Sequence, residues 1–329
     1  MTLVRRVTLA LAGALVLNWG AASVHAQGYP NKSITLIVPA AAGGPTDTVA
    51  RLLAESMSRT LGQTVVVENV GGAGGTVGMG RLKGMAPDGY TIGVWHISHA
   101  TAPALYDNLK YDVVADFDHI GRITDVPMTI VAKKDMPANT IAELFDWIRK
   151  EKDKVTYGHA GIGSGAHLCA LMLMKELGVQ MTAVSYRGTG PAMTDLVGGK
   201  LDVMCDQTTN TTNQIKGGAI KGYAVTTKTK VSSLPDLPTL DTTAVKGFDL
   251  SIWHAMWAPK GLPKEATDKL VNALTIALAD QTVKERLASL GTDPVPVAQI
   301  NPEALRSHLA AEVARLGVVI KAAGVKGAN

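Results

Sequence analysis

The side chains that could do chemistry are serines and histidines near the ends of predicted strands. Ser98 and His99 follow an apolar run that ends at Trp95, and Ser164 and His167 occupy a second glycine-rich segment. A serine near a histidine supplies the nucleophile and base types of a hydrolase. However, the segment around Ser164 lacks the G-x-S-x-G order of a nucleophile elbow, and it offers no third group to orient the base. We therefore favour binding, with an exported hydrolase acting on a small carboxylate ester as the alternative.

Metal and cofactor chemistry find less support. His96 and His99 form an H-x-x-H pair, but this segment has no nearby carboxylate or third histidine to complete a metal site. Residues 161–166 have the G-x-G-x-x-A spacing of a dinucleotide fingerprint, yet Tyr186 and Arg187 stand where its acidic residue is expected, about 20 positions later. We predict no metal and no cofactor.

The segment 39–47 has the clearest binding chemistry. It joins the apolar run 34–38, a predicted buried strand, to a segment with apolar residues three and four apart, a predicted helix that Gly62 ends. Thr46 or Asp47 can cap that helix. The small residues 40–44 leave the N–H groups and positive dipole end of the helix open to a carboxylate or phosphate. The alternative is a tight strand-to-helix turn that binds nothing.

The same architecture returns between residues 155 and 177. A predicted strand, 155–159, leads into the loop 161–165 and a predicted helix, 166–177, with Ser164 as a capping serine whose hydroxyl can also reach a ligand. Two such loops can face each other across a cleft. Asp206 follows a further predicted strand, 201–205, and is either a helix cap or a ligand contact.

Strands and helices alternate along the chain, which is the pattern of an α/β protein. The extended segment 120–133 is interpreted as a crossing into a second domain, and the kinked stretch 228–239 as the return. We therefore predict two lobes. Residues 27–123 and 229–329 form lobe 1, and residues 124–228 form lobe 2.

Residues 1–26 have the features of a signal peptide. Arg5 and Arg6 precede a mostly apolar run, 7–17, and a small-x-small site precedes Gln27. Cleavage there lowers the formal net charge from +4 to +2, and no basic block indicates nucleic-acid binding. We predict a periplasmic protein that does not bind nucleic acid.

The cysteines and two neighbouring tryptophans each have two interpretations. Cys169 and Cys205 lie in apolar stretches, so we predict buried free thiols, with a disulfide as the alternative. Trp253 and Trp257 lie in a predicted strand, 250–259. Tryptophans so close together are more often core residues than ligand contacts, although one at the mouth of a cleft can cover a ligand.

In this order, the motifs resemble the substrate-binding proteins of tripartite tricarboxylate transporters, also called Bug proteins. The resemblance covers nearly all of residues 29–325 and rests on the stretches YPNKSITLIVPAAAGGPTDTVARLLA, GQTVVVENVGGAGGTVG, APDGYTIG, GIGSGAHL, YRGTGPAMTDLVGGKLDVMCD, LPDLPT and VIKAAGV. It implies a two-lobed periplasmic-binding-protein fold of type II, α/β, with a mixed, mainly parallel sheet flanked by helices in each lobe. It also implies a protein that captures a small carboxylate, does no chemistry and delivers the ligand to integral-membrane transporter subunits. We expect a monomer.

The resemblance further implies a set of ligand-binding residues on the two facing loops and the neighbouring strand ends. They are Ala42, Gly43, Asp47, Ser98, His99, Gly163, Ser164, His167, Tyr186, Asp206 and Trp253. Backbone amides would hold the carboxylate, often through bridging waters, while residues 95–99 and Arg187 would select the rest of the ligand. A sensor for a signalling partner would use the same binding chemistry.

Overall fold

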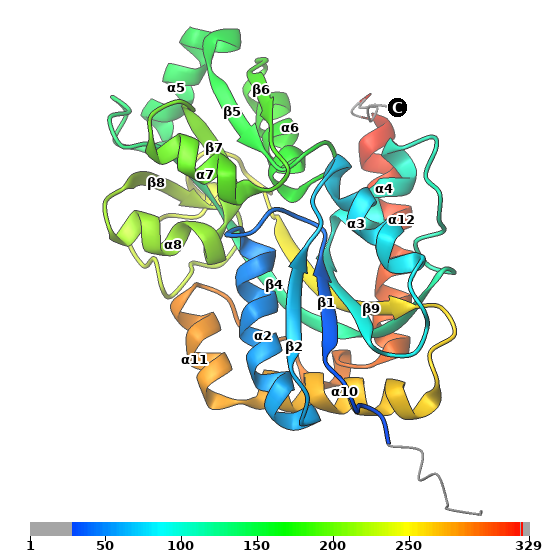
Figure 1. The fold of residues 1–329 in the computed structure, drawn as a ribbon. Coiled ribbons are helices and arrows are strands. Elements are labelled where there is room, and N and C mark those ends of the chain that lie inside the picture. Colours follow the sequence, from blue (N-terminus) through cyan, green and yellow to red (C-terminus); the bar gives the residue numbers. More distant parts are fainter. Residues whose placement is uncertain (1–27, 323, 325–329) are drawn as a thin grey trace, which may run out of the picture.

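The chain folds into two lobes that lie one above the other (Figure 1). This computed structural model describes residues 28–322 and 324. The predicted signal peptide, 1–26, lies outside the described residues. Lobe 1 occupies the lower part and the right side of Figure 1, and lobe 2, drawn in green, occupies the upper left.

One mixed sheet connects the lobes. In lobe 1 the strand order is β2 (Val65–Asn69), β1 (Ile34–Val38), β3 (Thr91–His96), β9 (Ser251–Pro259) and β4 (Phe117–Lys133). The sheet continues in lobe 2 from β4 to β7 (Val203–Gln207), β5 (Thr156–His159) and β6 (Thr182–Ser185), and β8 (Ile220–Val225) also pairs with β4. Strand β1 pairs in parallel with β2 and β3, and β5 with β6 and β7, whereas β4 pairs antiparallel with β7, β8 and β9.

Strand β4 belongs to both lobes. Its residues 117–127 pair with β9, and residues 128–133 pair with β7 and β8. The predicted extended segment 120–133 therefore lies within one continuous strand. The change of partner falls between Pro127 and Met128, and the predicted lobe boundaries at residues 123 and 228 stay a prediction.

Helices cover both faces of the lobe 1 sheet. On one side α2 (Pro45–Leu61) packs against α10 (Lys264–Ala279), and on the other α4 (Ser98–Leu105) packs against α12 (Pro302–Ala322) (Figure 1). The remaining helices of the lobe are α3 (Thr76–Lys83), α9 (Leu240–Thr243) and α11 (Gln281–Ser289), and lobe 2 contains α5 (Ile141–Glu151), α6 (Gly165–Leu177), α7 (Thr189–Val197) and α8 (Thr208–Lys216). Helices α4 and α8 were not predicted, because α4 is buried on most sides and α8 is rich in threonine and asparagine.

The start of α2 shows how the loop 39–47 is organised. Gly44 is the N-cap and Pro45 the first helical residue, so the predicted cap, Thr46 or Asp47, is wrong. Proline suits this position because its φ is already helical and its missing N–H would have no partner there. Asp47 instead accepts a hydrogen bond from the Gly43 N–H, at 2.9 Å, and thereby fixes the loop.

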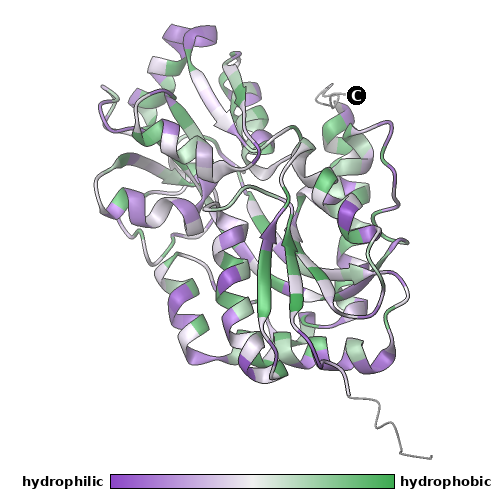
Figure 2. Ribbon diagram, viewed as in Figure 1, coloured by the Kyte–Doolittle hydropathy of each residue, from purple (hydrophilic) through white to green (hydrophobic). Residues whose placement is uncertain are grey.

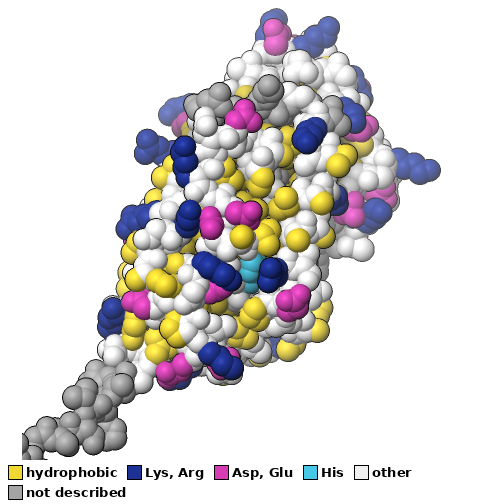
Figure 3. All heavy atoms as spheres, turned by 90° about the vertical axis from the view of Figure 1, so that its right-hand side faces the viewer, with side chains coloured by type: hydrophobic (Ala, Val, Ile, Leu, Met, Phe, Trp, Pro, Cys, Tyr) yellow, Lys and Arg dark blue, Asp and Glu magenta, His cyan; other side chains and the backbone are white. Residues whose placement is uncertain are grey.

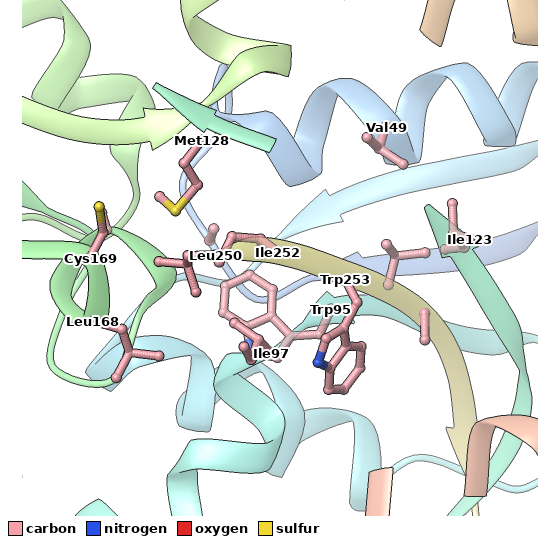
Figure 4. Close-up of a cluster of buried hydrophobic side chains, with 14 of the residues drawn as sticks. Val49, Trp95, Ile97, Ile123, Met128, Leu168, Cys169, Leu250, Ile252 and Trp253 are labelled. Atoms are coloured by element: carbon pink, nitrogen blue, oxygen red, sulfur yellow. The ribbon is translucent and has the colours of Figure 1, made fainter. Parts of the chain in front are cut away.

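The hydrophobic core extends from lobe 1 into lobe 2. The central strands are mainly hydrophobic, and the outer faces of the surrounding helices carry many hydrophilic residues (Figure 2). Where the lobes meet, Trp95, Ile97 and Ile252 belong to the same buried cluster as Met128 and Leu168 (Figure 4). The two lobes therefore share apolar packing at their junction.

The surface on the right of Figure 1 carries charges of both signs. Lysines and arginines lie among aspartates and glutamates on this face (Figure 3). Such mixing differs from the basic stripe of a nucleic-acid-binding surface. In the part of the chain that the structure describes, no helix is both long and apolar enough to cross a membrane.

The cysteines require a correction. Cys169 in α6 and Cys205 in β7 are buried, as predicted, but they form a disulfide and are not free thiols. The error has a physical cause, because α6 packs against β7 and brings two residues 36 positions apart to a Cα–Cα distance of 6.1 Å. That distance suits a disulfide.

Candidate functional site

A small cavity lies between the two lobes. Its volume is ≈ 20 Å³, room for about one water molecule. Its lining comes from the start of α2 and the end of β3 in lobe 1, and from the starts of α6 and α7 and the end of β7 in lobe 2: Ala40, Gly44, Pro45, Thr46, Trp95, His96, Ala160, Ser164, Gly165, Ala166, Gly188, Thr189, Asp206 and Gln207. A ligand of several heavy atoms can enter only when the lobes are further apart.

Helix α6 presents free donors to this cavity. Ser164 is its N-cap and accepts from the His167 N–H at 3.2 Å, which confirms the predicted capping role. Capping by Ser164 leaves the N–H groups of Gly165 and Ala166 without intrahelical partners, as at any helix start. Both residues line the cavity, so donors and the positive dipole end of α6 face it.

Helices α2 and α7 also begin at the cavity. Because Pro45 has no N–H, Thr46 carries the first N–H group of α2, and Thr189 carries the first of α7. Both threonines line the cavity. Helix N-termini from both lobes thus converge on one space, which is an arrangement suited to an anion.

The two lobes approach each other closely at glycines. A Cβ atom on Gly190 would lie 2.7 Å from the carbonyl oxygen of Ala42 and 2.9 Å from the Gly44 nitrogen. Nearby, the Ala41 N–H donates to the Arg187 carbonyl at 2.9 Å. Any side chain at position 190 would therefore keep the lobes apart.

Helix α4 adds hydrogen bonds across the same interface. The Ser98 and Thr101 hydroxyls donate to the Gly163 carbonyl at 3.1 and 3.0 Å, and the Tyr106 hydroxyl donates to the Ile162 carbonyl at 3.0 Å. These bonds hold the loop 161–165 of lobe 2 against lobe 1. The predicted site residues Ser98 and Gly163 thus meet each other at the interface.

The histidines on the lobe 1 side of the cavity are uncharged. Burial, and then the neighbouring His254, hold the pKa of His96 well below its usual value, and the ring accepts the Ser98 N–H on Nδ1 at 3.2 Å. His254 donates its Nδ1–H to the Ile252 carbonyl at 3.2 Å, so its Nε2 accepts the Thr46 hydroxyl at 3.0 Å. Neither ring therefore supplies a positive charge near pH 7.

Asp206 supplies the charged side chain of the lining. It is 1% exposed, and burial raises the pKa of its carboxyl to about 6, against the lowering effect of hydrogen bonds from Asn210, the Gln207 N–H and Thr189. The Asn210 amide donates to Oδ2 at 2.6 Å. Because the N-cap of α8 is Gln207, Asp206 is not the helix cap that the sequence allowed. It lines the cavity instead.

Some predicted residues lie beside the cavity. Gly163 donates its N–H to Nδ1 of His167 at 3.2 Å, so the two residues support the loop behind Ser164. Ala42, Gly43 and Tyr186 line a wider opening of ≈ 700 Å³ at the surface between the α2 loop and α7. A direct ligand contact by these residues stays a prediction.

The prediction of a ligand contact for His99 needs correction. Its ring is fully buried in lobe 1 against Phe117, Trp257 and Tyr111, and its Nε2 lies 3.1 Å from the Val113 carbonyl. Because Ser98 and His99 are consecutive on α4, their side chains point in different directions. Ser98 faces lobe 2 and His99 faces the core.

Trp253 and Asp47 also lie outside the cavity lining. Trp253 is 4% exposed, and its indole N–H donates to Glu312 of α12 at 3.0 Å, so the core interpretation of this tryptophan holds. The Asp47 carboxylate accepts from Arg51 at 3.0 Å and from Asn69 at 3.0 Å, in addition to Gly43. Asp47 organises the loop from inside lobe 1.

The structure also adds residues that sequence reasoning missed. Thr46, Thr189 and Gln207 line the cavity, and Thr101 and Tyr106 bridge the lobes. Thr46, Thr189 and Gln207 stand at or next to the starts of helices, and the glycine, proline and polar residues that mark such starts are visible in the sequence. Thr101 and Tyr106 had no such signal, because α4 was not predicted.

One family model matches this chain, that of the tripartite tricarboxylate transporter family receptor, over residues 49–325. The chain belongs to this family. A protein of the TAR-I ttuE–ttuC′ intergenic region of Agrobacterium vitis is 50% identical over 319 residues, which cover 97% of this chain and 92% of that protein.

Solved structures of similar proteins agree in fold. The periplasmic binding protein BugD matches with a TM-score of 0.89 at 50% identity, over 91% of this chain and 100% of BugD. MatC of Rhodopseudomonas palustris, solved with malate, matches with a TM-score of 0.85 at 36% identity, over 89% of this chain and 100% of MatC. Rpa4515 of R. palustris, solved with adipate, matches with a TM-score of 0.86 at 30% identity, over 91% of this chain and 100% of Rpa4515.

Family membership decides several predictions. The predicted periplasmic-binding-protein fold of type II, with a mixed sheet flanked by helices, is confirmed. This family receptor is a binding protein and not an enzyme, so the hydrolase alternative is set aside.

Proposed function

We propose that this receptor is exported to the periplasm, captures a small carboxylate between its lobes and delivers it to the membrane subunits of a tripartite tricarboxylate-type transporter. One observation carries the proposal. The starts of α2 and α6, which belong to opposite lobes and whose first N–H groups have no intrahelical partners, line the same cavity. The signal-peptide pattern in residues 1–26 supports export, and the malate and adipate bound by similar proteins support the ligand class.

The physical basis is an anion shared between two helix ends. Each helix start contributes about 0.3–1 kcal/mol to anion binding at an exposed site, and up to about 2 kcal/mol where it is partly buried. Closure of the lobes removes water, which strengthens both interactions in the lower dielectric. Such a ligand favours the state in which the lobes meet, and that state is what a membrane partner can recognise.

The first prediction removes one donor from the clamp. Ala166→Pro deletes an N–H that faces the cavity, at a first-turn position that proline tolerates. Since a hydrogen bond to a charged group is worth about 1.5–3 kcal/mol, the affinity for carboxylates should fall about tenfold or more. A thermal-shift screen of mono-, di- and tricarboxylates identifies the ligand, and calorimetry on residues 27–329 then measures the loss.

The matched control is Glu265→Pro. Glu265 is also the second residue of a helix, α10, but it is exposed and far from the cavity in the fold. The Glu265→Pro variant should bind the carboxylate with the same affinity as the unmodified chain. Unchanged affinity in Ala166→Pro, with circular dichroism showing an intact fold, would count against binding at α6.

A further inference from the structure

The loop 161–163 of lobe 2 is inserted between two elements of lobe 1. On one side lies α4, where a Cβ atom on Gly163 would lie 2.4 Å from Cδ1 of Leu105. On the other side lies the glycine-rich loop 71–75, where a Cβ atom on Gly161 would lie 2.8 Å from the Gly74 nitrogen. Glycines at both positions therefore let the backbone of the loop 161–163 reach lobe 1.

The N–H groups of this loop are satisfied inside lobe 2. Gly161 donates to Nδ1 of His159 at 3.1 Å, and Gly163 donates to Nδ1 of His167 at 3.2 Å. Both rings are buried, and their centroids lie 4.9 Å apart. Because an imidazole nitrogen that accepts an N–H carries no proton itself, both rings act here as neutral side chains. These bonds lie wholly within lobe 2, so they hold the shape of the loop whether or not lobe 1 is in contact.

The carbonyl groups of the loop are satisfied by lobe 1. The Ile162 carbonyl accepts from the Tyr106 hydroxyl, and the Gly163 carbonyl accepts from the Ser98 and Thr101 hydroxyls. Neither Thr101 nor Tyr106 lines the interlobe cavity. Because these bonds run directly from one lobe to the other, they stabilise the closed arrangement independently of a ligand.

We propose that the hydroxyl groups of Thr101 and Tyr106 form a latch that keeps the lobes closed and slows the release of a bound ligand. This inference rests on the proposed function and adds a control on the rate of release. Both residues act by positioning the loop 161–163 and not by touching the ligand. The lobes must break these bonds to open, whereas a ligand that enters the open form does not meet them. The latch therefore acts mainly on dissociation.

The two side chains suit a contact that forms and breaks repeatedly. The Thr101 hydroxyl also lies 3.1 Å from the Ser98 carbonyl of its own helix, so it keeps an acceptor when the lobes separate. Tyr106 is half-buried, so its hydroxyl can donate to water in the open form. Opening therefore leaves neither hydroxyl buried without a partner, a condition that would otherwise raise the free energy of the open form. Side chains that only stabilised lobe 1 would not need partners in both forms.

The second prediction removes the latch. Thr101→Val combined with Tyr106→Phe keeps the shapes of both side chains and deletes their donors. Without any ligand, small-angle X-ray scattering at pH 7.5 should show a larger radius of gyration than that of the unmodified chain, because fewer molecules are closed. With the carboxylate that the thermal-shift screen identifies, stopped-flow fluorescence should show dissociation about tenfold faster. The association rate should stay the same or rise.

The matched control is Thr275→Val combined with Tyr223→Phe. The Thr275 hydroxyl donates to the Val271 carbonyl at 2.8 Å within α10, and the Tyr223 hydroxyl donates to the Ala138 carbonyl at 2.8 Å within lobe 2. This variant loses the same two groups but no bond between the lobes, so its radius of gyration and dissociation rate should equal those of the unmodified chain. Thr101→Ser keeps a hydroxyl and should also release the ligand at the normal rate.

The outcomes separate the latch from carboxylate capture. If the latch variant has an intact circular dichroism spectrum, the radius of the unmodified chain and the same dissociation rate, the latch is wrong while capture stands. A larger radius with unchanged dissociation also overturns the latch, because opening then does not limit release. Equal changes in the control variant would assign the effect to lost hydroxyls in general. If no carboxylate binds, the proposed function fails, and equal radii without ligand would then overturn the latch as well.

Discussion

The buried histidines show how single residues acquired roles that their types did not reveal. His99 packs among Phe117, Tyr111 and Trp257, and its Nδ1 has no partner among the described residues. A ring in such surroundings is difficult to protonate, because burial disfavours the charged form. The serine and histidine that looked like a catalytic pair at positions 98 and 99 therefore serve different parts of the molecule.

The third prediction concerns stability at acidic pH. Burial lowers the pKa of His99 and His254 to about 3, whereas the unfolded chain binds these protons near pH 6.5. Stability is therefore lost as the pH falls below 6.5, by up to about 2 kcal/mol for each ring at pH 5. Asp206 acts in the opposite direction, since burial raises its pKa to about 6 and its protonation therefore stabilises the folded chain as the pH falls. This gain in the free energy of unfolding is only about 1 kcal/mol at pH 5.

Urea denaturation at pH 7.5 and pH 5 measures the net loss. The variant His99→Gln has one titrating ring fewer, so its stability should fall by about 2 kcal/mol less over the same pH interval. A variant that loses as much stability as the unmodified chain would show that His99 does not control the pH response.

At the scale of elements, the disulfide joins two parts of the candidate site. Cys169 lies one helical turn beyond Gly165 at the start of α6, and Cys205 directly precedes Asp206 in β7. The bond therefore holds the donors of α6 at a set position relative to the Asp206 carboxylate. This position follows from the packing of α6 on β7, which neither segment indicates alone.

The fourth prediction removes this bond. Cys169→Ala combined with Cys205→Ala should lower the free energy of unfolding by about 4 kcal/mol, the loop-entropy value for 36 residues. Affinity for the ligand should also fall severalfold at a temperature where the variant is fully folded. Calorimetry measures this, and reduction of the unmodified chain with dithiothreitol is an independent check. Full affinity after reduction would mean that the disulfide serves stability alone.

At the scale of the whole molecule, the proposed capture of a ligand depends on how closely the lobes can approach. The chain crosses from lobe 1 to lobe 2 within β4. The loop 39–47 of lobe 1 contacts lobe 2, and the loop 161–165 of lobe 2 contacts lobe 1, in both cases through backbone atoms and glycines. Such contacts leave little volume for side chains between the lobes. Small residues in both loops are therefore a condition for closure as well as for exposing N–H groups.

The fifth prediction prevents closure with one methyl group. Gly190→Ala places a Cβ atom against the backbone of Ala42 and Gly44 in the other lobe, while the helical φ of position 190 suits alanine. Each lobe should fold normally, and ligand affinity should fall about tenfold or more as the lobes are held apart. The control is Gly317→Ala in α12, where a Cβ atom meets nothing within 4 Å.

Calorimetry and small-angle X-ray scattering on both variants check this prediction. The control should bind normally and become more compact with saturating ligand, whereas Gly190→Ala should not become more compact. Equal affinity and equal compaction would show that the lobes need not touch at this point.

The sequence by itself determined the features that depend on neighbouring residues. The strand at 34–38, the helix ended by Gly62, the Ser164 cap and the glycine-rich loops follow from local spacing and hydrogen bonding, and the ordered motifs indicated the family. Tertiary structure decided which side chains face the space between the lobes, because that depends on the direction in which each helix or strand packs. For this reason Ser98 and Asp206 reach the interface while His99 and Trp253 face the core, and Cys169 meets Cys205 across 36 residues.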